Sequence, residues 1–123
     1  LDSERRELLD QKHLDDLCHK LQRDRAIAIL SECYRSLADD FHHQLKQIET
    51  ACSATDRAGL IPVVHGLKGA VASLGWKKSA AYYERSLVAL KNATFDDFER
   101  FPSKLAEDFR LSSQAMQRYM DQL

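Results

Sequence analysis

The sequence predicts an all-α fold: an antiparallel four-helix bundle with a short additional N-terminal helix, in a single domain spanning residues 1–123. Apolar residues recur at steps of three and four over most of the chain, which is the periodicity of amphipathic helices. The chain has only four glycines and two prolines, and it has no Asn-Gly or Asp-Gly hairpin signal. A length of 123 residues suits one compact domain with its own core.

The first expected helix is short and begins after Asp10, a favourable N-cap residue. Leu9 precedes this cap and Leu14 occupies the fourth helical position, which is the arrangement of a hydrophobic staple. A second, long helix is expected from about Asp24 to Ser53. Its core-facing residues are Ile27, Leu30, Tyr34, Leu37, Phe41, Leu45, Ile48 and Cys52.

The third helix is expected to start near Thr55 or Asp56 and to end at or near Gly75. Pro62 falls inside it, and an interior proline removes a backbone donor, so we expect either a kink or an irregular first turn. The buried stripe of this helix consists of Leu60, Val64, Leu67, Val71 and Leu74.

The fourth helix is expected to follow directly and to stop near Asn92. Thr94 with Asp97 suggests another cap, so we expect a short helical turn and then a long final helix that continues beyond Pro102. Four amphipathic helices joined by short loops pack as an antiparallel bundle. The fourth stripe and the final one comprise Trp76, Ala80, Tyr83, Leu87 and Leu90, then Leu105, Phe109, Met116, Tyr119 and Leu123.

The composition excludes several classes of protein. Lys plus Arg (18) nearly balance Asp plus Glu (19), so the chain lacks the basic field of a protein whose main partner is nucleic acid. No apolar run approaches the roughly 20 residues that span a bilayer, and no secretory signal is apparent. Cys18, Cys33 and Cys52 are odd in number and widely spaced, so we expect reduced core thiols. We therefore expect a cytoplasmic, monomeric domain, and its start at Leu1 rather than methionine suggests a longer polypeptide.

The stretch VVHGLKGAVASLG, residues 63–75, carries the candidate chemistry. Each interior glycine weakens a helix by about 1 kcal/mol relative to alanine, so stability alone does not explain this composition. At about 100° per residue, His65 points roughly 140° away from the buried stripe, and Lys68 and Gly69 share its outer face. An exposed neutral imidazole is a competent nucleophile, and a lysine one turn away stabilises the oxygens of an arriving phosphoryl group.

The run from His65 to Gly75 resembles the H-x-L-K-G-x-x-x-x-x-G signature of histidine phosphotransfer (HPt) domains of bacterial and related phosphorelays. The expected bundle resembles that family over almost the whole chain. The resemblance implies that His65 is the phosphoacceptor, that Lys68 assists electrostatically, and that Gly69 stays small for a docking partner. It also implies exchange of the phosphoryl group with aspartates of receiver domains, which belong to a hybrid sensor kinase or a response regulator. The domain itself would be the C-terminal module of a hybrid sensor kinase, and a free-standing phosphotransfer protein fits almost as well.

The same resemblance implies that the receiver brings Mg²⁺, whereas this domain binds no metal or cofactor and has no ATP-dependent kinase activity. No nucleotide-binding glycine loop occurs in the sequence. The dimerisation helix of a histidine kinase is a poorer match, because there an acidic residue and soon a proline usually follow the histidine. Gly66 and Leu67 do not match that pattern.

The expected docking surface is the exposed strip around His65, with lysines at its rim that would meet an acidic receiver pocket and affect mainly the association rate. In the resembled family, a polar side chain on the next helix often supports the histidine. The sequence leaves that residue open among Ser79, Tyr82, Tyr83, Ser86 and Leu87. The docking strip and its rim comprise Ile61, Lys68, Gly69, Ala72, Lys77 and Lys78.

Two other classes remain as alternatives. A non-catalytic scaffold or inhibitor of a receiver or kinase would have the same fold and an inert His65, although the presence of Lys68 argues against it. A metal-binding bundle would use carboxylate and histidine pairs at i, i+3 spacing, but the facing glutamates of such sites are not apparent. The pairs with this spacing are Asp16 with His19, Asp39 with His42, and Asp40 with His43.

Overall fold

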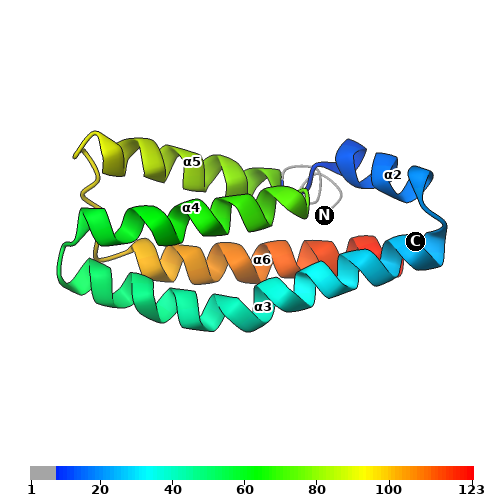
Figure 1. The fold of residues 1–123 in the computed structure, drawn as a ribbon, viewed down its shortest axis with the longest axis horizontal. Coiled ribbons are helices and arrows are strands. Elements are labelled where there is room, and N and C mark those ends of the chain that lie inside the picture. The colour runs from blue at the N-terminus through cyan, green and yellow to red at the C-terminus, as the bar shows by residue number, and fades with distance from the viewer. Residues whose placement is uncertain (1–7) are drawn as a thin grey trace.

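The computed structural model describes residues 8–123, and these residues form helices joined by turns, as the sequence predicts (Figure 1). Each of the four longer helices packs against two others, α3 and α5 on both α4 and α6, which closes a four-helix bundle. The short helix α2 packs against α3 at one end of the molecule. The helices are α2 (Gln11–Lys20), α3 (Arg23–Ser53), α4 (Arg57–Ser73), α5 (Lys77–Lys91) and α6 (Phe101–Asp121).

Among the described residues, no helix has both the length and the apolar character that crossing a bilayer requires.

The start of α2 is fixed to the turn between α4 and α5. The carboxylate of Asp10 accepts a hydrogen bond from the backbone N–H of His13 at 3.1 Å, which confirms the expected N-cap. The backbone N–H of Asp10 donates to the carbonyl of Gly75 at 2.5 Å. Leu9 and Leu14 are both completely buried in the core, as a hydrophobic staple requires.

Gly75 meets two requirements that only glycine satisfies without strain. Its φ is +71°, in the left-handed region. A Cβ atom at this position would also lie 3.1 Å from Cγ of Leu14, which is closer than ordinary side-chain packing allows. The close approach of α2 and the tight α4–α5 turn therefore depend on the same residue.

Helix α3 begins and ends within a residue of its expected bounds, and its stripe faces the core except at Ile27, where the neighbouring Ala26 is buried instead.

The burial expected for the cysteines is only partly correct. Cys52 is buried, Cys18 is half-buried with its Sγ 3.5 Å from Oη of Tyr119, and Cys33 is exposed. The expectation of a core thiol is wrong for Cys33 because this residue lies beside the buried stripe that contains Leu30 and Leu37, not in it. The neighbouring Ile29 is also 39% exposed.

Helix α4 starts with a regular capped turn rather than an irregular one. The carboxylate of Asp56 accepts a hydrogen bond from the N–H of Gly59 at 2.9 Å. The helix then continues through Pro62 to Ser73. Pro62 and Ala58, whose carbonyl loses its usual partner, are both exposed, so water is able to hydrate that carbonyl.

The expected cap at Thr94 is wrong. Its hydroxyl donates back to the carbonyl of Ala89 at 3.3 Å, so it serves the end of α5 rather than the start of α6. A single helical turn does precede α6, as expected, because the N–H of Phe101 donates to the carbonyl of Asp97 at 3.0 Å.

Arg57 holds this α5–α6 connection against the start of α4. Its Nε and Nη2 atoms donate to the carbonyl of Phe95 at 3.1 and 2.9 Å. The guanidinium also lies over the ring of Phe98, 5.1 Å from its centroid. One side chain therefore satisfies a loop carbonyl and covers an aromatic ring.

Aromatic rings from three segments fill the middle of the bundle. Phe41 of α3 stacks on Phe109 of α6, with centroids 4.0 Å apart, and the completely buried Trp76 lies 5.6 Å from Phe109. Tyr34 lies 6.1 Å from Trp76. This cluster joins α3 and α6 to the residue that follows the Gly75 turn.

Near the start of α5, the side chain of Ser79 forms a polar contact between α5 and α6. The hydroxyl of Ser79 donates to Oδ2 of Asp108 at 2.5 Å, and it lies 3.1 Å from the hydroxyl of Ser112. Burial raises the pKa of the Asp108 carboxyl, while the Ser79 hydrogen bond and the charge of Lys78 oppose that rise.

Replacing Gly75 by alanine should destabilise the fold by about 1–2 kcal/mol, because the positive φ and the contact with Leu14 both become unfavourable. Urea unfolding followed by circular dichroism measures this. The matched control is Gly69→Ala, whose added Cβ meets nothing within 4 Å, so it should stabilise the helix by roughly 0.5–1 kcal/mol. Equal stability of the two variants would contradict this account of the turn.

Asp108→Asn should raise the urea midpoint at pH 7, because the amide still accepts the Ser79 hydrogen bond without burying a charge. The carboxyl pKa is raised in the folded state, so its contribution to stability is present in acid and is lost as pH rises through the folded-state value. The advantage of the variant should therefore shrink towards pH 3. The control Asp39→Asn, at an exposed position, should give a urea midpoint that differs from wild type equally at both pH values. A midpoint of D108N below that of wild type at pH 7 would refute the prediction.

Candidate functional site

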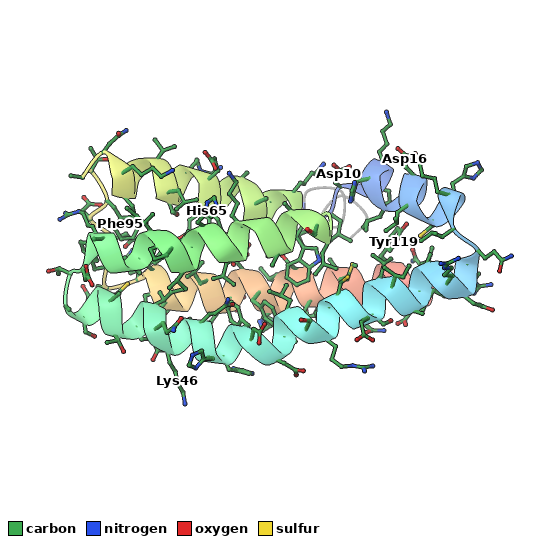
Figure 2. The ribbon with its side chains drawn as sticks, in the orientation of Figure 1. Asp10, Asp16, Lys46, His65, Phe95 and Tyr119 are labelled. Carbon is green, nitrogen blue, oxygen red and sulfur yellow. The ribbon has the colours of Figure 1, made fainter. Side chains whose placement is uncertain are left out.

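His65 lies on the outer face of α4, in the part of the helix that runs beside α5 (Figure 2). Its side chain is exposed, whereas the opposite face of the helix is buried in the core. Val64 and Leu67, close to His65 in the sequence, belong to the buried stripe. With 3.6 residues per turn, these two side chains point into the core while His65 points to solvent.

The surroundings of His65 along α4 are open. A Cβ atom built on Gly66 or on Gly69 would meet nothing within 4 Å, so neither glycine is required by close packing. Ala72 is exposed on the same side of the helix, two turns beyond His65. Ile61, one turn before His65, is less exposed than a docking residue was expected to be, because it is half-buried against the core.

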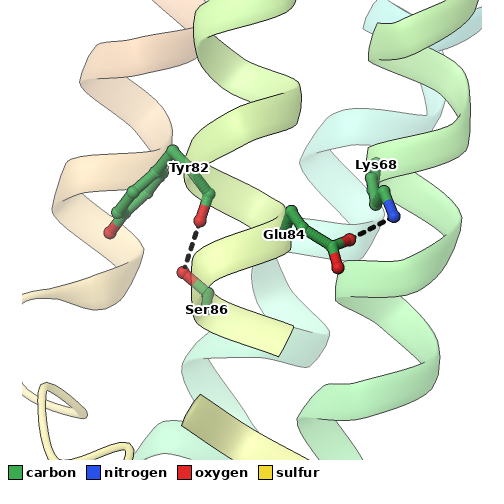
Figure 3. A network of polar contacts seen from close by, with 4 residues as sticks. All are labelled: Lys68, Tyr82, Glu84 and Ser86. Atoms are coloured by element: carbon green, nitrogen blue, oxygen red, sulfur yellow. Dashed lines mark hydrogen bonds and ion pairs between the residues drawn. The ribbon is translucent and has the colours of Figure 1, made fainter. Parts of the chain in front are cut away.

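Lys68 forms an ion pair with Glu84, which bridges α4 and α5 (Figure 3). Nζ of Lys68 donates to Oε2 of Glu84, and the two side chains are 36% and 51% exposed. The hydrogen bond and charge of Lys68 lower the pKa of the Glu84 carboxyl, and Lys91 and His65 lower it further. The carboxylate therefore lies within electrostatic reach of His65.

Sequence reasoning did not single out Glu84. The sequence does contain a signal for this pairing. Lys68 and Glu84 lie at similar distances along the chain from Gly75, on the two sides of the α4–α5 turn, and antiparallel helices bring such residues together. Glu84 also lies outside the apolar stripe of α5, so it is free to face solvent between the two helices.

The five residues considered as support for His65 are engaged elsewhere. Ser79 contacts Asp108 on α6, and the hydroxyl of Ser86 donates to the carbonyl of Tyr82 at 2.9 Å within α5. Tyr83 and Leu87 are buried in the core. The ring of Tyr82 lies on the α6 side of α5, 6.1 Å from that of Phe101, whereas Glu84 lies on the α4 side (Figure 3).

The two rim lysines lie at the first two positions of α5, and both are exposed. Lys78 belongs to the α6 side: its charge acts on Asp108, and it lines a hollow of about 400 Å³ together with Leu111. The structure therefore does not bring Lys78 to the face that carries His65. Val88, one turn beyond Glu84 on α5, is 48% exposed and adds an apolar side chain that sequence reasoning missed.

The carboxylate and histidine pairs on α2 and α3 are all exposed. Within residues 8–123, no three side chains of His, Cys, Asp or Glu come together as a metal site requires. The pairs are Asp16 with His19, Asp39 with His42, and Asp40 with His43.

Comparison with models of known protein families, with curated proteins and with solved structures found no match to this chain.

Proposed function

We propose that this domain is a phosphotransfer module of the HPt type, in which His65 accepts a phosphoryl group from a receiver-domain aspartate and passes it to another. The observation that carries the proposal is one constellation: an exposed His65 on a bundle helix, Lys68 one turn away, and open space at Gly69. The spacing of these residues is that of the resembled signature. We infer a cytoplasmic setting from the reduced cysteines and the proposed partners.

The proposed step is a simple displacement. The lone pair on the unprotonated ring nitrogen of His65 forms the N–P bond while the P–O bond of the aspartyl phosphate breaks. The electron pair of that bond stays on the receiver carboxylate, and the proton on the other ring nitrogen remains in place. The reverse step returns the phosphoryl group to a second receiver aspartate, so the domain needs no nucleotide.

This chemistry asks the domain mainly for access and charge. An exposed His65 with small neighbours lets the acidic active site of a receiver, with its Mg²⁺, approach in line. Lys68 supplies a positive charge for the phosphoryl oxygens. The proposed docking strip comprises Ile61, His65, Lys68, Gly69, Ala72 and Val88, with Lys77 at its rim.

His65→Gln should abolish labelling by phosphorylated receiver domains in the presence of Mg²⁺, because glutamine cannot form the phosphoramidate. The wild type should acquire an acid-labile, base-stable label, detected after gel electrophoresis. The control is His43→Gln, an exposed histidine on α3, which should label normally. Tight binding of receivers without any label would favour the scaffold or inhibitor alternative, and a label that survives in H65Q would place the acceptor elsewhere.

Gly69→Gln should slow transfer from a receiver by at least about tenfold, because a steric penalty of only about 1.4 kcal/mol at the docking surface has this effect. Gly66→Gln provides the matched control: it adds the same side chain at an equally open position, but about 100° around the helix from His65, whereas Gly69 lies about 40° from it. This control should stay within roughly threefold of wild type. Both variants should keep full helicity, and equal transfer rates in the two would disprove the role of Gly69.

A further inference from the structure

We propose that Glu84 is a built-in competitor for Lys68: it holds the lysine while His65 is free, and it resists release of the lysine to a phosphoryl group on His65. This inference rests on the proposed function and deepens it. The consequence is a phosphohistidine of higher transfer potential than Lys68 alone would allow.

The geometry supports competition rather than simple assistance. Lys68 lies one turn from His65 on α4, so its flexible side chain is able to reach either group. Its observed partner is Glu84, on a different helix. Glu84 lies in the interior of α5, and the packing of α5 on α4 holds the carboxylate opposite Lys68.

Among the described residues, Lys68 has the largest effect on the pKa of the Glu84 carboxyl, and Lys91 and His65 contribute less. Arg85, the next residue on α5, has its guanidinium 6.0 Å from the ring centroid of Tyr82, on the other side of the helix. Glu84 therefore depends mainly on the same lysine that a phosphoryl group would need.

On a phosphorylated domain, two anionic groups would lie near the single positive charge of Lys68. A phosphoryl group with up to two negative charges would share Lys68 with the carboxylate of Glu84. The pair is partly exposed, so solvent and salt weaken these interactions, and effects of a few-fold rather than a thousandfold are expected. Removing the carboxylate should stabilise the phosphorylated ground state. In the loose transition state for loss of the phosphoryl group, negative charge leaves the phosphoryl oxygens, so Lys68 stabilises this transition state less than it stabilises the phosphohistidine. A more available Lys68 should therefore lengthen the lifetime of the phosphohistidine.

The test uses phosphoramidate, which phosphorylates histidines chemically without any receiver. The lifetime of the His65 phosphoryl group is followed by ³¹P NMR, with the signals that remain in H65Q assigned to the other histidines. Glu84→Gln should lengthen this lifetime about three- to tenfold, and Lys68→Met should shorten it. In the K68M background, adding E84Q should change the lifetime less than about twofold, because the two residues act as a unit.

The matched control is Glu107→Gln, which removes an exposed carboxylate from a comparable ion pair with Arg110 on α6 and should leave the lifetime unchanged. A second readout is the carboxyl titration of Glu84 by NMR, where K68M should raise the low pKa of the carboxyl. An E84Q lifetime equal to wild type, or an E84Q effect that persists in K68M, would overturn the inference. Failure of every receiver to label His65 would instead overturn the proposed function, since the chemical arm does not depend on receivers.

Discussion

The turn at Gly75 is the constraint on which the arrangement of the candidate site depends. The N–H of Trp76 donates to the carbonyl of Val71 at 3.0 Å, which closes α4, and the positive φ of Gly75 then directs the chain into α5. Helices that leave one tight turn in opposite directions have a fixed register, and this register places Lys68 opposite Glu84. A longer connection would move the two charges apart without changing either helix.

The division of α4 into two faces separates stability from chemistry. The inner residues are completely buried and contribute through the apolar area removed from water, at about 25 cal/mol per Å². The outer residues around His65 are exposed and add little to that term. Substitution on the outer face is therefore expected to change access and charge while the bundle persists.

Sequence reasoning succeeded where the signal is local and failed where it depends on register. Asp10 and Asp56 cap helices within three residues of themselves, so helix starts could be predicted closely. The exposure of Cys33 depends on which side of α3 faces its neighbours, and the Thr94 hydroxyl bonds to the end of α5, where the sequence had suggested a cap for the next helix. Glu84 was missed because its role depends on a residue of another helix, and an apolar stripe gives no information about that pairing.

Helix α4 contains three glycines, and close packing accounts for only one of them. Gly59 is required locally, because a Cβ there would lie 2.3 Å from Oδ2 of the Asp56 cap. Gly66 and Gly69 have no such requirement, yet each weakens the helix by about 1 kcal/mol, and the interior Pro62 weakens it by about 3 kcal/mol. The packing of α4 against α3 and α5 compensates for this weakness. At Gly69, beside His65, a small residue at this stability cost is best explained by access to the face, and the proposed approach of a receiver to His65 provides that reason.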